Sequence, residues 1–348
     1  MDFGLSDEQK LLQETIRKLL GDAFPTTRAR AISKTGSAHD PALWAKLAEA
    51  GALGALVPER HGGSELSFLD AMLVAEEIGR AAGPGAYAAS AVMAAVALRA
   101  ADESLQKELL PEIASGTTRV GVGLAEVHGG RDGAGVALAA GRAEGTALFV
   151  LDAVEADLLL LHTGGGLALL HAPGLSLTPL PTVDGTRRLA EVQLHGAQPL
   201  ALLEGTERVL AFDALGASER ALELAVSYAL ARKQFDRVIG SFQAVKHMLA
   251  EMAAELEPAR SLAWYAAHAF DHEPREAQRL AALCKAHLAE VATECLRKAT
   301  EVHGGIGFTE QYDLHLWFRR VALSRPLLGG PEALREEASR LRVDPRPL

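Results

Sequence analysis

Cysteine is scarce in this sequence: its 348 residues contain only Cys284 and Cys295. If one helix carries both, about three turns and roughly 16 Å separate them along one face, which is too far for a disulfide. The opening MDFGLSDEQKLL also lacks the basic-then-apolar layout of a secretion signal. Together these absences predict a protein of the reducing cytoplasm.

Positive charge is not in excess either, since 35 Lys and Arg stand against 45 Asp and Glu, for a formal net charge of −10. The basic residues are scattered among acids, whereas nucleic-acid phosphates need clustered cations, so nucleic-acid binding is not expected. The alanine-rich, charge-free run over residues 81–98 is interrupted by a Gly-Pro-Gly sequence. It therefore predicts a buried helix rather than a membrane span.

The composition favours a sizeable core, because 49% of the residues are hydrophobic and the length suits two or three domains. Ser6 followed three residues later by Gln9 predicts a capping box at the start of a first helix. Apolar residues then recur at helical spacing. These patterns predict an N-terminal helical domain over residues 1–118, with helical segments near 43–53, 69–78, 86–98 and 105–114.

From Arg119 the sequence changes to short apolar runs divided by glycines, such as RVGVGLAE, TALFVLD and DLLLLHT. Such runs predict a small middle β-barrel or sheet over residues 119–203. The glycines between Gly121 and Gly145, and the triplet at 164–166, are interpreted as turns.

Helical spacing returns over residues 206–232, 241–271, 273–302 and 310–323. It predicts a C-terminal four-helix bundle within residues 204–348. The expected fold class is α+β, mainly α. Strands and helices do not alternate along the chain, which argues against a Rossmann fold despite the many glycines.

Cations gather in the segment YALARKQFDRVIGSFQAVKH, residues 228–247. Arg232, Lys233 and Arg237 precede a turn and a new helix, which we expect Ser241 to cap. Guanidinium groups beside the free amides of a helix start attract phosphate oxygens. The alternative is an ordinary solvated helix end with surface charges.

A glycine-rich loop follows in HGGIGF, residues 303–308. Its glycines would let a planar or phosphate-bearing group approach the backbone. The alternative is a helix-to-helix turn with a glycine cap. No metal site is expected, because His268 and His272, four apart on one predicted helix, have no third ligand at a matching spacing.

Taken in order, these features resemble the acyl-CoA dehydrogenase family of flavoproteins over the whole chain. The matching segments are the opening FGLSDEQ, the stretch VPERHGGSELSFLDAMLVAEEIGR, R-x-Q-F from Arg232, I-G-S-F-Q ending at Gln243, and H-G-G-x-G-F from His303. The resemblance implies FAD as cofactor, an acyl-CoA thioester as substrate and a dimer or tetramer as assembly. In this family a carboxylate removes the α-proton of the thioester while the flavin takes a hydride from the β-carbon.

The carboxylate that this chemistry needs is missing from its usual place. Counted without gaps from the glycine loop, that place is Leu328, in a Leu-Leu-Gly-Gly turn with neither acid nor base. Removing a general base typically costs about 10²- to 10⁴-fold in rate. Some members carry the base earlier, where the matching position is Thr206, so Glu207 is a fallback base if the alignment shifts by one residue. Glu207 is otherwise an ordinary first-turn glutamate favoured by the helix dipole.

Contacts that the family uses for a chain's own flavin ring are also depleted. The T-E-P-x-x-G-S-D loop becomes AEVHGGRD, in which Glu126 matches but Ala125 and Arg131 replace the Thr and the Ser. The W-x-T strand becomes Phe-Val-Leu, with Leu151 in place of the Thr. Each missing hydroxyl forfeits about 1 kcal/mol or leaves a polar flavin atom unpaired.

Contacts that the family offers to the neighbouring subunit's FAD are largely kept. The resemblance assigns the ADP half of that FAD to the R-x-Q-F residues, the helix start after them and the glycine loop. Glu301 stands where the family usually has Gln, Asp236 where it has Gly, and Val238 where it has Pro. The corresponding candidate cofactor residues are Arg232, Gln234, Phe235, Gln243, Glu301, His303, Gly304 and Gly305.

Contacts to the chain's own flavin ring are thus lost, while contacts to a neighbour's FAD are kept. This pattern is similar to that of heteromeric acyl-CoA dehydrogenases, in which an active subunit pairs with a degenerate one, as is known for enzymes that act on steroid CoA thioesters. Our first hypothesis is that the chain is such a non-catalytic subunit and lends FAD contacts to a partner. The second is an active homomeric dehydrogenase that uses Glu207 or another acid. The third is a non-enzymatic assembly or regulatory module with the same fold.

Overall fold

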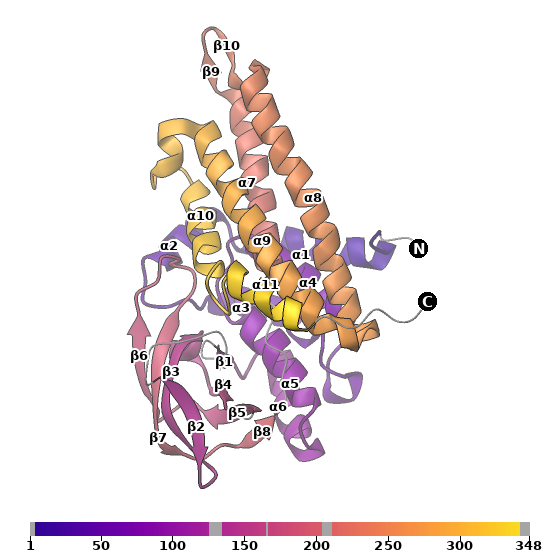
Figure 1. Cartoon of the computed structure of the whole chain (residues 1–348), viewed down its shortest axis with the longest axis vertical. Helices are drawn as coiled ribbons and strands as arrows, with labels where there is room; N and C mark the ends of the chain where they lie inside the picture. Colours follow the sequence, from indigo (N-terminus) through magenta and orange to yellow (C-terminus); the bar gives the residue numbers. More distant parts are fainter. Residues whose placement is uncertain (1–3, 125–133, 165, 204–210, 342–348) are drawn as a thin grey trace.

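The computed structural model describes residues 4–124, 134–164, 166–203 and 211–341. Figure 1 shows three regions: a group of N-terminal helices, a sheet at one end of the molecule, and long C-terminal helices that extend away from the sheet. The prediction of a mainly helical α+β fold, with helices, strands and helices in that order, is confirmed.

The N-terminal helices begin where the capping signals place them. Ser6 and Gln9 form the expected capping box, because each backbone N–H donates to the other's side chain, at 3.1 and 3.2 Å. Helix α2 was not anticipated from the sequence. The bounds are α1 (Asp7–Ala23), α2 (Thr26–Ser33), α3 (Pro41–Glu49), α4 (Phe68–Arg80), α5 (Ala95–Arg99) and α6 (Glu103–Ser115).

The alanine-rich run at 81–98 is only partly the helix that the sequence predicts. A buried π-helical segment, Tyr87–Ala94, comes first and continues directly into α5. The wider π-helical turn accommodates the buried Tyr87, whose hydroxyl donates to the carbonyl of Ala71 at 3.0 Å. No helix in the described ranges is both long and apolar enough to cross a membrane.

Within the described ranges, strands β1 to β8 form one eight-stranded sheet, ordered β6-β7-β3-β1-β4-β5-β8 with β2 paired to β3. All printed pairings are antiparallel except β1 with β4. The bounds are β1 (Val120–Gly123), β2 (Gly135–Ala139), β3 (Arg142–Leu151), β4 (Leu158–Thr163), β5 (Gly166–His171), β6 (Ser176–Leu180), β7 (Leu189–Ala197) and β8 (Ala201–Leu203).

The interpretation of the sheet glycines as turns is wrong for several of them. Gly121 and Gly123 lie within buried β1, where a Cβ would come within 2.9 and 2.8 Å of neighbouring side chains. Gly145 lies inside β3, and a Cβ there would be 2.2 Å from the carbonyl oxygen of Gly135. Only a residue without a side chain allows these close approaches. Gly141 does lie in a turn, between β2 and β3.

The C-terminal region contains the four predicted helices and one more: α7 (Ala211–Ala231), α8 (Gln243–His272), α9 (Pro274–His303), α10 (Leu314–Ser324) and α11 (Pro331–Arg340). A short hairpin, β9 (Lys233–Gln234) with β10 (Arg237–Val238), joins α7 to α8 at the tip farthest from the sheet (Figure 1). Cys284 and Cys295 are both buried on α9 and unpaired, as expected.

Ser241 does not cap α8, contrary to the prediction. The helix begins two residues later, and Phe242 occupies the cap position without a side-chain hydrogen bond. The Ser241 hydroxyl instead donates to the carbonyl of Val238 at 2.7 Å, because a short 3₁₀ turn, Ile239–Ser241, intervenes.

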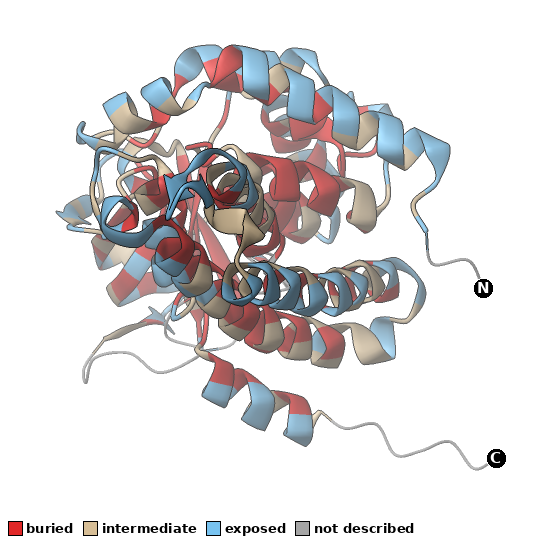
Figure 2. Cartoon of the chain, turned by 90° about the horizontal axis from the view of Figure 1, so that it is seen from above, coloured by how far each residue is buried: buried red, intermediate tan, exposed pale blue. Residues whose placement is uncertain are grey.

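One apolar core runs from the N-terminal helices into the C-terminal bundle, while a second core lies within the sheet. Buried residues line the inner faces of the bundle helices, and exposed ones their outer faces (Figure 2). Helices α4 and α7 meet backbone to backbone: a Cβ at Gly216 would lie 1.8 Å from the carbonyl oxygen of Glu76, and one at Gly79 would lie 2.1 Å from that of Asp213.

Candidate functional site

The turn between α10 and α11 carries Leu328, the residue at the expected base position. Leu328 is 7% exposed and belongs to the large apolar core. Its φ of 58° lies in the left-handed region, which is unfavourable for a leucine, and Gly329 follows with a φ of 100°. The site therefore holds an aliphatic side chain, packed in apolar surroundings, in a backbone conformation that is held by its context.

A buried polar network fixes the chain just before this turn. Lys285 of α9 donates to the carbonyl of Ser324 at 2.8 Å, and Arg187, from the loop before β7, donates to the Ser324 hydroxyl at 2.8 Å. Burial lowers the pKa of Lys285 to about 8, and the charge of Arg187 acts in the same direction. Loop, sheet and bundle therefore meet at the end of α10.

The same network ties the sheet to the first turn of α7. Arg187 forms an ion pair with Asp213, and Arg320 donates to Asp213 at 2.7 Å and to the Thr186 hydroxyl at 2.9 Å. All four of these residues are at least nine-tenths buried. A charge network without access to water must be nearly complete, because each charge left alone would be costly.

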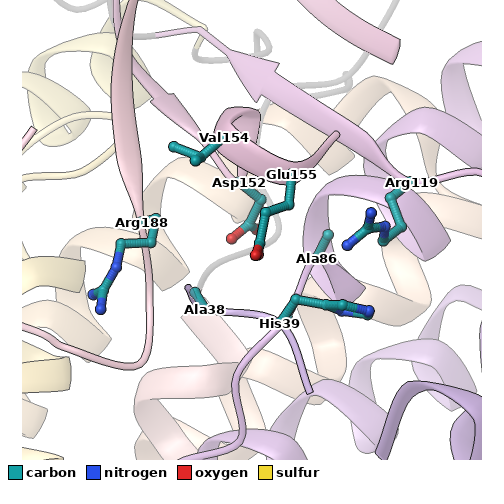
Figure 3. Close-up of a pocket in the computed structure, with 9 residues that line it drawn as sticks. Ala38, His39, Ala86, Arg119, Asp152, Val154, Glu155 and Arg188 are labelled. Atoms are coloured by element: carbon teal, nitrogen blue, oxygen red, sulfur yellow. The ribbon is translucent and has the colours of Figure 1, made fainter. Parts of the chain in front are cut away.

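A small polar pocket lies where the N-terminal helices meet the sheet (Figure 3). Asp152 and Glu155 point toward its centre, with His39 and Arg119 beside them. Burial raises the pKa of Asp152 to about 7, opposed by Arg187 and Arg320. The cavity is about 20 Å³, enough for a single water molecule. No motif in the sequence pointed to it, because its residues come from separate segments.

The strand positions where the family has W-x-T are apolar. Phe149 has a φ of 52° and is 47% exposed, at an irregularity in the pairing of β3 with β7. Leu151 is buried between β1 and β7, where it pairs with Val122 and Leu189. Neither side chain has a hydroxyl for a polar ligand. The candidates Glu126 and Glu207 lie outside the described residues.

The hairpin at the tip presents the R-x-Q-F residues to solvent. Phe235 is 86% exposed, and it and Asp236 form the turn with φ values of 53° and 58°. The side chains of Arg232 and Gln234 are exposed and make no hydrogen bond or ion pair within the described part of the chain. Arg237 instead lies over the ring of Phe242, 4.0 Å from its centre.

The glycine loop lies next to the end of α9. Gly304 adopts a φ of 63°, and a Cβ at Gly304 or Gly305 would meet no heavy atom within 4 Å. The loop backbone is thus open to an approaching group, as the sequence suggested. Glu301 is exposed and pairs with Arg297 on its own helix, while the exposed Gln243 contacts His247 at 2.8 Å.

His303, another predicted cofactor residue, points inward. It is 3% exposed, its Nδ1 lies 2.7 Å from the carbonyl oxygen of Ala299, and its ring packs against Tyr228 and Tyr312 at 4.6 and 4.5 Å. Burial lowers its pKa, opposed by the Ala299 contact. The buried ring is thus turned away from the loop surface, and its Nε2 has no partner among the described atoms.

The two histidines considered from the sequence as possible metal ligands both lie on α8. His268 and His272 are exposed on α8 with their ring centres 4.3 Å apart. Among the residues whose positions are described, no group of three or more His, Cys, Asp or Glu side chains is arranged to hold a metal ion.

Comparisons with known proteins agree with this fold. The family model for the acyl-CoA dehydrogenase N-terminal domain matches residues 6–117, and that for the C-terminal domain matches residues 202–340. Acyl-CoA dehydrogenase IpdE2 of Mycobacterium tuberculosis is 31% identical, over 97% of this chain and 99% of its own length.

Two solved structures superpose closely. A variant of the Tcur3481–Tcur3483 steroid ACAD has a TM-score of 0.87 at 29% identity, covering 96% of this chain and 97% of its own. The ChsE4–ChsE5 complex from Mycobacterium tuberculosis has a TM-score of 0.89 at 27% identity, covering 98% of both chains. With both family models matched in order and a curated relative aligned end to end, the chain belongs to the acyl-CoA dehydrogenase family.

Proposed function

We propose that this chain is the non-catalytic subunit of a heteromeric acyl-CoA dehydrogenase and contributes FAD contacts to an active partner. The observation that carries the proposal is the buried Leu328 at the base position, together with the exposed Arg232 and Gln234 at the hairpin between α7 and α8, which have no partner within the described ranges. Proton abstraction needs a carboxylate at the thioester, and an aliphatic side chain supplies none.

The described residues fit FAD unequally. At the tip, a guanidinium and an amide with no partner among the described residues, together with an exposed aromatic ring, suit a diphosphate and a planar base. The glycine loop at the end of α9 adds an open backbone. At the sheet, the buried Leu151 offers no hydrogen bond to a flavin ring edge. The fit therefore favours a cofactor held across a subunit boundary over one held wholly by this chain.

Each residue of the hairpin and of the glycine loop has a distinct role in this proposal. Arg232 and Gln234 bind the phosphate-bearing half of the partner's FAD, Phe235 packs on a planar group, and Gly304 and Gly305 allow close approach. When bound, FAD supplies the hydride acceptor for α,β-dehydrogenation. The chain's own part is to bind and orient the cofactor and to exclude water from it.

The substrate class that we propose is a bulky acyl-CoA, a steroid CoA thioester. The support is that one structural relative is described as a steroid ACAD and another as a complex of two chains. The sheet and bundle of this chain superpose on both with high TM-scores.

The decisive experiment is an absorption spectrum of the purified chain, alone and co-expressed with a dehydrogenase encoded nearby. We expect little flavin in the isolated chain and a yellow, active complex with the partner. Arg232→Ala should lower the FAD content of the complex, whereas Arg275→Ala, on another part of the bundle, should not. A fully flavin-loaded, active homomer of this chain would contradict the proposal.

Two further variants separate the remaining possibilities. If the isolated chain did turn over an acyl-CoA, Glu207→Gln would test whether Glu207 is its base. Leu328→Glu restores a carboxylate at the usual place, yet we expect no activity from the isolated chain, because the flavin-ring contacts are lost as well. A complex whose activity is unchanged when this chain is removed would instead favour an assembly module.

A further inference from the structure

A second cleft, far in sequence from the cofactor motifs, lies between α1, α4, α7 and α10. It has a volume of about 360 Å³, in the size range of small-molecule sites. Leu20, Phe24 and the indole of Trp317 form its apolar floor and are each almost fully buried as residues. The cleft is thus a partly open hollow with a buried apolar floor.

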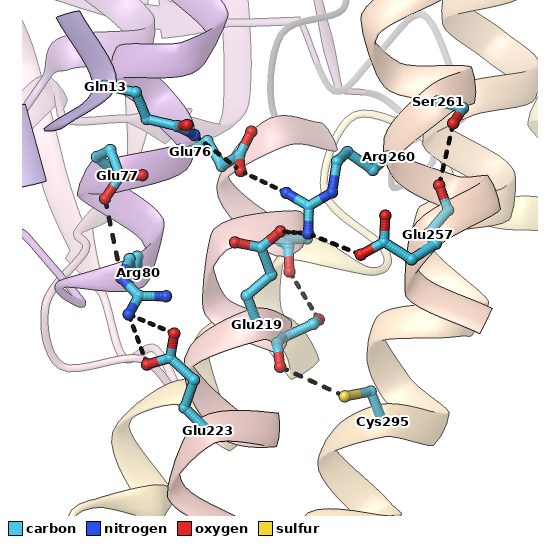
Figure 4. A network of polar contacts seen from close by, with 12 residues as sticks. Gln13, Glu76, Glu77, Arg80, Glu219, Glu223, Glu257, Arg260, Ser261 and Cys295 are labelled. Atoms are coloured by element: carbon cyan, nitrogen blue, oxygen red, sulfur yellow. Dashed lines mark hydrogen bonds and ion pairs between the residues drawn. The ribbon is translucent and has the colours of Figure 1, made fainter. Parts of the chain in front are cut away.

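Three guanidinium groups surround this cleft, one from each of three helices. Arg17 comes from α1, Arg80 from α4 and Arg220 from α7. They share two carboxylates: Arg17 binds Glu77 through two hydrogen bonds of 2.7 and 2.9 Å, and Arg80 and Arg220 both bind Glu223 (Figure 4 shows the Arg80 pairs).

Among these five side chains the cations exceed the anions by one, in a chain whose net charge is −10. The Nη1 groups of Arg17 and Arg80, and the Nε and Nη2 groups of Arg220, have no acceptor within the described ranges. Arg220 lies 5.9 Å from the Trp317 ring centre, at the boundary of the charged rim and the apolar floor. Unused N–H groups in such a rim are suited to carboxylate or phosphate oxygens.

We propose that this cleft binds a small organic anion, a carboxylate or phosphate group attached to an apolar body. The anionic group contacts the guanidinium rim, and the apolar body lies against Leu20, Phe24 and Trp317. The proposal does not depend on FAD binding or on the catalytic state of the chain, because neither the tip residues nor Leu328 line the cleft.

Gly21 provides a direct way to block the cleft. It lies on α1 and lines the hollow, and a Cβ built there would meet no heavy atom within 4 Å. Gly21→Phe therefore fills empty space without displacing the core, and it removes a helix glycine that disfavours folding. Gly21→Ala is the matched control, since a methyl group leaves most of the volume open.

The test is titration calorimetry of the full-length chain with decanoate, phenyl phosphate and inorganic phosphate. We expect saturable binding of decanoate, phenyl phosphate or both, which also identifies the anionic group, and much weaker binding of inorganic phosphate. Gly21→Phe should abolish this binding and Gly21→Ala should keep it. Arg220→Gln should weaken it by about tenfold, as expected for loss of a charge-assisted hydrogen bond.

Arg335→Gln serves as the charge-matched control, because Arg335 is paired with Glu290 on the surface of α9 and α11, away from the cleft. Circular dichroism should establish that every variant is folded. If Gly21→Phe did not fold, the ligand affinity of Arg220→Gln compared with that of Arg335→Gln would decide whether the cleft is the binding site. Binding that survives both cleft variants, equal binding of inorganic phosphate, or no saturable binding of either organic anion would overturn the proposal.

Discussion

At the level of single residues, the buried acids between α4 and α7 are the most unusual feature. Glu76 is fully buried, with its Oε1 in contact with Arg260 at 3.2 Å and with the amide of Gln13 at 3.3 Å (Figure 4), while its Oε2 has no partner among the described atoms. Burial first, and then the nearby Glu219, raise the pKa of Glu76 well above its ordinary value, opposed by Arg260. The folded chain therefore holds this proton more tightly than the unfolded chain does.

That difference predicts a pH-dependent stability. The contribution of protonated Glu76 is fully present below the unfolded pKa, roughly 4.3, and is lost as pH rises through the higher folded pKa. The substitution Glu76→Gln removes this dependence of stability on pH. The free energy of unfolding of the variant should therefore exceed that of the natural chain, by a margin that grows as pH rises. Urea unfolding across pH 5 to 9 measures the difference.

Glu77 provides the control for that experiment. It is equally buried but is bound by both Arg17 and Arg80. Glu77→Gln should destabilise the chain, because Arg17 loses its carboxylate and Arg80 keeps only Glu223. A Glu76→Gln difference that did not change with pH would mean that Glu76 is ionised in the folded chain at every pH tested.

At the level of elements, the β9–β10 hairpin carries a strained turn. Phe235 and Asp236 both have positive φ, the arrangement of a two-residue turn that favours glycine at its second position. Asp236→Gly should raise the free energy of unfolding by about 0.5–1 kcal/mol, whereas Asp236→Ala should not raise it. Thermal unfolding distinguishes the two. A stabilising Asp236→Ala would show that backbone conformation is not the cause.

The α4–α7 contact predicts opposite effects for two helix glycines. Gly216→Ala places a methyl group 1.8 Å from the Glu76 carbonyl oxygen, so the helices must separate, at a cost of about 1–3 kcal/mol or more. Gly21→Ala, in open space on α1, should instead stabilise by up to about 1 kcal/mol. If both substitutions stabilised the chain in urea unfolding, helix propensity and not helix contact would dominate.

At the level of the whole molecule, the sheet is joined to the bundle through buried charges. Arg320→Met removes one of the two cations that pair with Asp213, together with the donor to Thr186, and should cost about 3–5 kcal/mol. In the Arg320→Met variant, we expect calorimetry to resolve separate unfolding transitions for the sheet and for the bundle. Arg188→Met is the control, since each hydrogen bond that Arg188 donates within the described ranges goes to a backbone carbonyl. A single transition, shifted equally in both variants, would contradict the coupling.

The sequence predicted much of this organisation from local patterns. The capping box at Ser6, the four long C-terminal helices and the succession of strands follow from spacing that is visible within one segment. The predictions that were wrong, for Ser241 and for the glycines of β1 and β3, concern residues whose roles depend on neighbours distant in sequence. The domain boundaries near residues 118 and 203 stay a prediction.

The candidate site divides in the same way. The sequence by itself determined that the base position is Leu328 and that the R-x-Q-F and glycine motifs are kept, because residue identity is read directly from the chain. Only the tertiary structure decided that His303 points inward, that Arg232 and Gln234 have no partner in the described part of the chain, and that three arginines from three helices surround one cleft. Burial and pairing arise from packing between segments, and no local pattern in a sequence specifies them.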